Sequence, residues 1–410
     1  MNGLAAYQPR DTLFLWLLQQ PEQPVLVGEL QMVRSLRGVS LRYSDTWLRQ
    51  GFALSEDLPL VSGEFLPQER DSAAGAVDDA RPDRWGERLI RFLDKPPRLS
   101  LMEFLYFAGD ERFGALGVST SGEQYAPRRF GPLPTLADTE AIHELVRKVL
   151  DNEPVPEAQK RLVSPGVTMG GARPKALIEV DGEQWVVKFS DGDAVDSPLI
   201  EHASMTLAAT AGIRSAITRP LRLADGHAVA VKRFDRQGGR RIHALSASVA
   251  LKAAGERLGY PELAQLLRRR GVAEGGVNVQ QMRELFRRMV FNILIDNTDD
   301  HEKNHVLLVH ANQHWELSPA FDVLPSGQAL GYQQMRVGTD EADSTLDNAM
   351  SMHGLFALKK DEAAAEVRRV CGVVQGWAGH FEQAGVARRD IALLAEQIDR
   401  PFLRTQREGF

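Results

Sequence analysis

Residues 297–304 read Asn297-Thr298-Asp299-Asp300-His301-Glu302-Lys303-Asn304, and a further carboxylate, Asp322, follows a predicted hairpin. Phosphoryl transfer needs a carboxylate that orients and deprotonates the attacking hydroxyl, and hard oxygen ligands that hold magnesium on the phosphates. The D-x-x-x-x-N spacing, the hairpin and the later aspartate follow the order found in protein kinases. Each of these residues could also simply end a helix or form a turn. The combined pattern indicates phosphoryl transfer.

The same segment fits a second pattern, because His301-Glu302-Lys303-Asn304-His305 matches the H-E-x-x-H motif of zinc proteases. That chemistry needs two histidines one turn apart inside a continuous helix. Here a polar stretch precedes the motif and the β-prone run Val306-Leu307-Leu308-Val309 follows it directly. A zinc metalloprotease acting through His301, Glu302 and His305 is therefore the weakest of the alternatives.

A strongly amphipathic segment, residues 281–295, leads into the quoted stretch. Its apolar side chains recur with the three- and four-residue spacing of one helix face. They are Met282, Leu285, Phe286, Met289, Val290, Ile293 and Leu294. We therefore predict a helix that delivers the chain to Asn297, followed by short strands at 306–309 and 315–317.

Other parts of a phosphate site precede this helix in the chain. Lys188 ends an apolar strand, where a cation is costly without an anionic partner, and Glu201 in the next predicted helix could be that partner. The run Thr168-Met169-Gly170-Gly171 precedes a strand, and adjacent glycines let backbone N–H groups approach phosphate oxygens closely. Lys232-Arg233-Phe234-Asp235 follows the last strand, where a kinase contacts adenine, and Phe234 could stack on the base.

Composition limits the remaining possibilities. The chain has 410 residues, 43% of them hydrophobic, so it can bury a large core divided among two or three domains. The net charge of -6 excludes a global basic field toward nucleic acid or membrane. The single cysteine, Cys371, has apolar neighbours and is predicted to be buried. Because no signal peptide or long apolar run is present, we expect a soluble cytoplasmic protein without membrane contact.

The order of elements predicts an α/β N-terminal half and an all-α C-terminal half. Short strands within 12–66 suggest a small antiparallel sheet, and helices are expected at 85–93, 138–151 and 199–211. A loop rich in Gly, Ser and Pro from about Gly117 to Pro134 is the best candidate boundary. Basic runs at 268–270 and 283–288 are interpreted as solvated helix faces rather than a DNA surface.

These motifs together resemble the HipA family of bacterial toxin–antitoxin kinases. The resemblance runs through residues 168–175, Val186-Val187-Lys188, Arg233-Phe234-Asp235-Arg236, 298–304 and Phe321-Asp322, and extends to Leu58-Pro59-Leu60 and Pro82-Asp83-Arg84-Trp85-Gly86 near the N-terminus. The block at 298–304 is the most specific part.

The resemblance implies a bilobal, protein-kinase-like fold with three parts. These would be a small α/β coupling domain at 1–120, a kinase N-lobe with phosphate loop and hinge at 121–240, and a helical C-lobe at 241–410. It implies a serine/threonine kinase that uses ATP and Mg²⁺.

By the same resemblance, Asp299 would be the catalytic base, and Asn304 and Asp322 the metal ligands. The implied ATP-binding residues are Lys188, Gly170, Gly171, Ala172, Lys232, Phe234 and Asp235. Glu201, His301 and Lys303 would support the site, with His301 as the structural histidine behind the loop. Thr168, or Ser164 nearby, would be the autophosphorylated residue.

Implied partners are a protein substrate, such as an aminoacyl-tRNA synthetase, and a small helix-turn-helix antitoxin of the HipB type. DNA would be reached only indirectly, through that antitoxin. A second hypothesis is a kinase-shaped regulator that has lost activity and acts with a DNA-binding antitoxin; the presence of base, metal ligands and lysine disfavours it.

Overall fold

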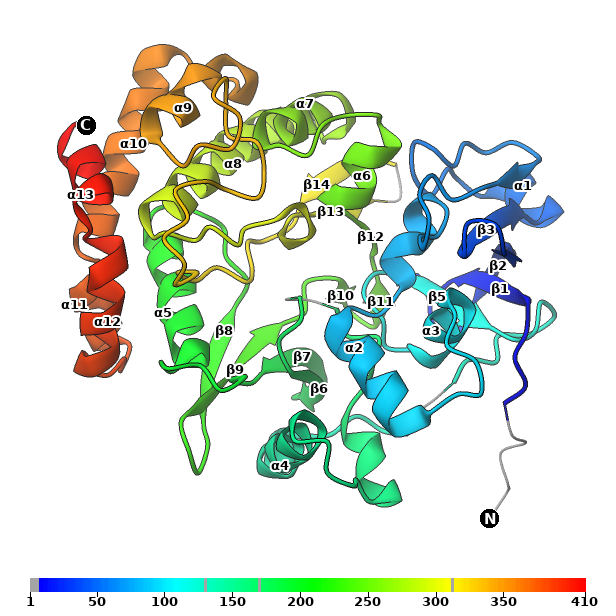
Figure 1. Ribbon diagram of the computed structural model, residues 1–410. Coiled ribbons are helices and arrows are strands. Elements are labelled where there is room, and N and C mark those ends of the chain that lie inside the picture. The colour runs from blue at the N-terminus through cyan, green and yellow to red at the C-terminus, as the bar shows by residue number, and fades with distance from the viewer. Residues whose placement is uncertain (1–6, 129–130, 169–170, 311–312) are drawn as a thin grey trace. The chain divides into compact units, whose positions relative to one another are not determined.

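A computed structural model describes residues 7–128, 131–168, 171–310 and 313–410 (Figure 1). The chain forms two compact units. The first extends to Val186 and also includes Asp235–Leu245, and the second comprises Val187–Phe234 and Ser246–Phe410. Within the described residues, no helix combines the length and apolar character needed to cross a membrane.

The first unit contains a five-stranded antiparallel sheet in the order β4-β3-β2-β1-β5. Its strands are β1 (Thr12–Leu17), β2 (Val25–Val33), β3 (Gly38–Tyr43), β4 (Glu64–Phe65) and β5 (Leu116–Ser119). The sheet predicted within 12–66 is therefore confirmed. Helix α3 (Leu101–Phe107) packs against β1, β3 and β5, which buries the apolar faces of sheet and helix together.

Strand β5 corrects the predicted loop from Gly117 to Pro134. Gly117, Val118 and Ser119 pair with Trp16, Leu15 and Phe14 of β1, so the loop begins only after Ser119. All four residues of β5 are buried. Glycine and serine predict a turn when judged locally, but pairing with a central strand decides their conformation here.

The other elements of the first unit are mostly short helices. They are α1 (Asp45–Gln50), η1 (Gly75–Ala80), α2 (Arg84–Leu89), η2 (Ile90–Asp94), η3 (Leu136–Asp138), α4 (Thr139–Leu150) and η4 (Glu157–Leu162). Its remaining strands are β6 (Lys175–Val180), β10 (Arg236–Gln237) and β11 (Arg240–Arg241). Strands β7 (Glu183–Lys188) and β12 (His243–Ser246) run from the first unit into the second. The helices expected at 85–93 and 138–151 are confirmed within a few residues.

The second unit is built around helix α8 (Val277–Leu294), which packs against α7 (Tyr260–Arg270) and α10 (Lys360–Gln375) (Figure 1). All seven apolar residues of the predicted helix face, from Met282 to Leu294, are fully buried. The amphipathic pattern therefore identified the central helix of this unit correctly. The chain then turns into the segment that begins at Asn297.

Further elements surround this helix. They are α5 (Ser197–Thr210), β8 (Thr218–Arg222), β9 (His227–Lys232), α6 (Ala247–Ala253), η5 (Glu274–Gly276), η6 (Glu302–Asn304), β13 (Val306–Val309), β14 (Trp315–Leu317), α9 (Leu346–Ser351), η7 (His353–Phe356), α11 (Trp377–Gln383), α12 (Arg388–Ile398) and α13 (Pro401–Glu408). The strands at 306–309 and 315–317 form the expected antiparallel hairpin.

The structure is mixed α/β, and two expectations need correction. The C-terminal half is mostly helical, but it also contains the β13–β14 hairpin, so it is not all-α. Strand β8 was not expected from the sequence; it is an edge strand, where the missing N–H of Pro220 is tolerated. The bilobal arrangement and the three domain boundaries stay predictions.

Candidate active site

Lys188 is the last residue of β7, and its ammonium lies between two carboxylates. Its Nζ donates to Oε1 of Glu201 and to Oδ1 of Asp322, each at 2.6 Å. Lys188 and Glu201 are both about 1% exposed. The partner expected from the sequence, Glu201, is thus present, and Asp322 is a second partner that the sequence did not predict.

The electrostatics of this triad favour a charged lysine. Burial alone would lower the pKa of Lys188, but the adjacent carboxylates of Asp322 and Glu201 outweigh that effect, and the pKa is raised. An ammonium has three donors, and two of them are used here. A buried cation of this kind suits an anionic ligand that can replace or join its carboxylate partners.

Asp322 lies in an unusual backbone conformation. Its φ is +58°, in the left-handed region, which few residues other than glycine, asparagine and aspartate adopt. Asp322 lies between the buried residues Phe321 and Val323, and its partly exposed carboxylate contacts Lys188. Aspartate is one of the residues that tolerate this backbone, so the residue type suits the position.

The backbone before Asp322 is anchored by side chains of α8. Arg288 is buried, its Nη2 donates to the carbonyl oxygen of Ser318 at 2.7 Å, and its Nε donates to Glu284 at 3.0 Å. Oε1 of Gln281 accepts from the N–H of Leu317 at 2.9 Å. The sequence predicts only that Gln281, Glu284 and Arg288 are helical. Their contacts are with a segment some thirty residues later, which a local pattern does not reveal.

The segment 297–304 contains both buried and exposed residues. Thr298 and Asp300 are buried, whereas Asp299 between them is exposed. Asn304 is buried and ends the single 3₁₀ turn η6, and Lys303 before it is exposed. The predicted base is therefore accessible to a substrate, while its neighbours fix the backbone.

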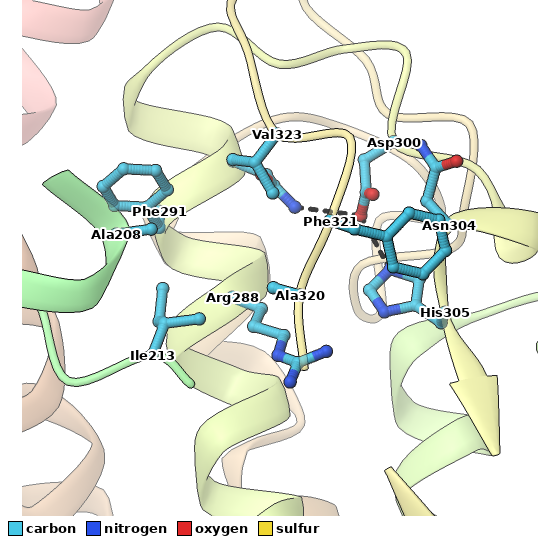
Figure 2. Close-up of a pocket in the computed structure, with 11 residues that line it drawn as sticks. Ala208, Ile213, Arg288, Phe291, Asp300, Asn304, His305, Ala320, Phe321 and Val323 are labelled. Atoms are coloured by element: carbon cyan, nitrogen blue, oxygen red, sulfur yellow. Dashed lines mark hydrogen bonds and ion pairs between the residues drawn. The ribbon is translucent and has the colours of Figure 1, made fainter. Parts of the chain in front are cut away.

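Asp300 is the centre of a buried hydrogen-bond network that the sequence did not predict (Figure 2). Its Oδ2 accepts from the hydroxyl of Tyr260, from Nδ2 of Asn292 at 2.9 Å and from Nε2 of His305 at 2.8 Å. Burial alone would raise the pKa of Asp300, but His305 and the other donors outweigh it, so the pKa is lowered. Asp300 directly follows Asp299, and His305 directly follows Asn304. The hydrogen bond between His305 and Asp300 therefore links the backbone next to both candidate functional residues.

The histidine fixed by this network is His305 rather than the predicted His301. His305 is 2% exposed and its ring packs edge-on against Tyr260, whereas His301 is only half-buried. The two histidines do not share a helix, because η6 is one turn long and β13 begins at Val306. Within the described ranges, no three His, Cys, Asp or Glu side chains are grouped to hold a metal. The geometry gives the zinc-protease alternative no support.

A cavity of about 10 Å³ lies behind this network (Figure 2). Arg288, Asp300, Asn304, His305, Ala320 and Phe321 are among the residues that line it. Ligand sites for small molecules enclose several hundred Å³, so this cavity is a gap in the packing rather than a nucleotide site.

The predicted adenine-contacting residues divide between the two units. Lys232 ends β9 and Phe234 follows it, both half-buried in the second unit, where the Phe234 ring lies 5.4 Å from that of Phe321. Asp235 belongs to the first unit and is completely buried. Its Oδ2 accepts hydrogen bonds from the N–H of Gly114 and from Nη1 of Arg236, both at 2.8 Å. These bonds hold the protein backbone and side chains of the first unit together.

The described residues of the predicted phosphate loop at 168–175, and Ser164 before it, lie in the first unit. Ser164 is buried, Thr168 is half-buried and Ala172 is exposed. Gly171 has a φ of +64°, with open space where a side chain would begin. Gly170 lies outside the described residues. Lys175, at the end of this loop, is completely buried.

The basic runs form intramolecular contacts. Arg269, Arg283 and Arg287 pair with Glu256, Glu362 and Glu366 respectively. Arg270 lies over the ring of Trp315. The exposed Arg268 and Arg269 agree with their interpretation as a solvated helix face, but Arg288 is buried, so the run at 283–288 is not such a face. Cys371 is buried as expected, and burial raises its thiol pKa to about 11.

Comparison with known proteins adds two family matches. The family described as HipA-like C-terminal domain matches residues 167–377, and the family described as HipA N-terminal domain matches residues 23–119. A protein of Sinorhizobium fredii named "Putative kinase Y4dM" is 29% identical over 202 residues, which are 45% of this chain and 46% of that protein. The chain thus matches less than half the length of this curated relative.

The fold also resembles a solved structure, the Shewanella oneidensis HipA in its complex with HipB and operator DNA. The TM-score is 0.67 with 17% identity, covering 97% of both chains, which shows a shared fold. The Helicobacter pylori proinflammatory kinase CtkA matches at a TM-score of 0.38 with 14% identity, covering 59% of this chain and 94% of that one.

Proposed function

The chain belongs to the HipA family, and we propose that it is a serine/threonine protein kinase that transfers the γ-phosphate of ATP to a protein hydroxyl. The observation that carries this proposal is the buried Lys188, held between Glu201 and Asp322 in the same unit that exposes Asp299. Burying the ammonium of Lys188 and the carboxylate of Glu201 is costly even when they are paired, and such buried charges cluster at functional sites. A phosphate-binding lysine next to a metal-binding carboxylate is such a use.

The donor set fits magnesium. Asn304 and Asp322 offer an amide and a carboxylate oxygen, which are the hard ligands that Mg²⁺ prefers. When bound, magnesium would neutralise charge on the transferring phosphate. Asp299 would accept the proton of the substrate hydroxyl, and Lys188 would donate to phosphate oxygens. Lys232 and Phe234 would contact the nucleotide, with Gly171 and Ala172 from the phosphate loop.

The partners follow from the family. The solved HipA relative is in a complex with HipB and operator DNA. We propose a HipB-like antitoxin as the neutralising partner of this chain, with DNA reached through that antitoxin. A translation enzyme such as an aminoacyl-tRNA synthetase is the proposed target class, and Thr168 or Ser164 the proposed self-phosphorylated residue.

The test is incubation of the purified chain with labelled ATP, magnesium and a cell extract, comparing wild type with Asp322→Asn. Asparagine tolerates the left-handed backbone at this position, so the fold should survive, and thermal denaturation checks this. We expect labelled protein bands from wild type and at least a ~10²-fold loss in the variant, because one metal ligand and one charge partner are removed. Equal labelling by both proteins would overturn the proposal. Absence of labelling by wild type, with antitoxin binding intact, would favour the inactive regulator.

A further inference from the structure

The segment Pro82-Asp83-Arg84-Trp85-Gly86 has no part in the chemistry proposed above, yet three of its residues contact the flanks of the predicted phosphate loop. The segment starts helix α2, and Asp83 is its N-cap, accepting from the N–H of Gly86 at 2.9 Å. All the contacts described next lie inside the first unit.

The first contact is a buried ion pair. Lys175 is completely buried, and its Nζ donates both to Oδ2 of Asp83 and to the carbonyl oxygen of Gly171. The ammonium therefore links the start of α2 to the loop residue with a left-handed backbone. An unpaired lysine would be costly in this interior, so the ion pair with Asp83 holds the ammonium of Lys175 in place. The same ammonium then holds the carbonyl oxygen of Gly171.

The second contact fixes the end of the loop. Trp85 is 2% exposed, and its Nε1 donates to the carbonyl oxygen of Lys175 at 2.8 Å. An indole N–H buried without a partner costs free energy, so this bond constrains the backbone at Lys175 as well as its side chain.

The third contact fixes the start of the loop. A Cβ built on Gly86 would lie 2.0 Å from the carbonyl oxygen of Pro165. Only glycine permits the backbone of Pro165 to approach α2 so closely. Both described flanks of the loop are thus attached to one five-residue segment.

We infer that Asp83, Trp85 and Gly86 are positioning residues, which hold Pro165, Gly171 and Lys175, on either side of residues 169–170, in place for nucleotide binding. The consequence for ATP binding rests on the proposed kinase function, whereas the contacts themselves do not depend on it. A loop whose backbone N–H groups bind phosphate must be ordered beforehand, since ordering it on binding would weaken affinity. The N-terminal part of the chain would then contribute directly to the affinity for ATP.

The experiment compares Asp83→Asn and Trp85→Phe with wild type. Asparagine remains a good N-cap, so Asp83→Asn removes mainly the charge that faces Lys175. Trp47→Phe is the matched control, because Trp47 is also buried in the first unit and its Nε1 donates to the carbonyl oxygen of Phe52 at 3.1 Å, away from the loop. Amide hydrogen exchange over residues 171–175 and steady-state phosphate transfer are measured on each protein.

We expect faster exchange at 171–175 in both variants and unchanged exchange in Trp47→Phe. For Asp83→Asn, KM for ATP should rise about tenfold with kcat changed far less, because loop ordering affects ground-state binding. The double variant Asp83→Asn/Lys175→Met should be no worse than Lys175→Met alone, since both changes remove one interaction.

The outcomes separate the two proposals. Wild type that transfers no phosphate, combined with faster exchange in both variants, would refute the kinase function and leave the positioning role standing. Active wild type with unchanged exchange and unchanged KM in both variants would overturn the positioning role. If Asp83→Asn fails to fold, Trp85→Phe against Trp47→Phe decides the question in the same way.

Discussion

The proposed catalytic segment at 298–305 and the proposed phosphate loop at 168–175 are both anchored by buried charges, but the anchors come from different distances along the chain. Asp300 is bonded to His305 five positions later, to Asn292 eight positions earlier and to Tyr260 forty positions earlier. Lys175 is bonded to Asp83, 92 positions earlier. The first segment is therefore fixed largely from within its own neighbourhood, and the second by a remote helix.

This difference has a structural consequence for each segment. The proposed catalytic segment exposes Asp299, the proposed base, and the buried residues around it belong to the same unit and follow the central helix α8 directly. The described residues of the proposed phosphate loop are bonded to α2, so we expect changes in α2 to reach them directly. The comparison predicts that substitutions in the two regions will affect different measurable quantities.

The largest effect should come from Asp299→Asn. Losing a general base typically reduces the rate about 10²- to 10⁴-fold, and because this side chain is exposed, the free energy of unfolding should barely change. Phosphate transfer at saturating ATP and thermal denaturation measure the two quantities. A variant that keeps its rate, or one that unfolds, would show that the exposed and buried aspartates have been assigned the wrong roles.

The adjacent substitution, Asp300→Asn, should act mainly on stability. It removes the charge that accepts from Tyr260, Asn292 and His305, and disrupting a buried pair costs about 3 kcal/mol. Urea denaturation of the variant, with Asp299→Asn as the matched neighbour, measures this loss. Equal stability of the two variants would contradict the idea that the catalytic segment is fixed by its own buried network.

How far these features could be predicted depends on the range of the contacts. Helix α8, the following hairpin and the order of Lys188, Asp299 and Asp322 were predictable, because periodicity and spacing are local properties of the sequence. The bond between Lys188 and Asp322 was not, since its partners are 134 positions apart.

Two features depend on contacts that local patterns do not contain. The resemblance implies His301 as the structural histidine, whereas the structure bonds His305 to Asp300. The glycine and serine of β5 predict a loop when considered alone, but pairing with β1 makes this segment a strand. In both cases the deciding partner comes from tertiary structure, which local patterns do not contain.

The smallest effect concerns pH, and it tests the charge of the catalytic network. Because the folded-state pKa of Asp300 is lowered, its ionised form stabilises the fold above the unfolded-state value near 4. That contribution is lost as the pH falls through the folded-state pKa. The free energy of unfolding of wild type should therefore fall more steeply below pH 4 than that of Asp300→Asn, which has no proton to bind there. Parallel curves for the two proteins would mean that the three donors to Asp300 stabilise it without depending on its charge, and the catalytic segment would then be held by hydrogen-bond geometry alone.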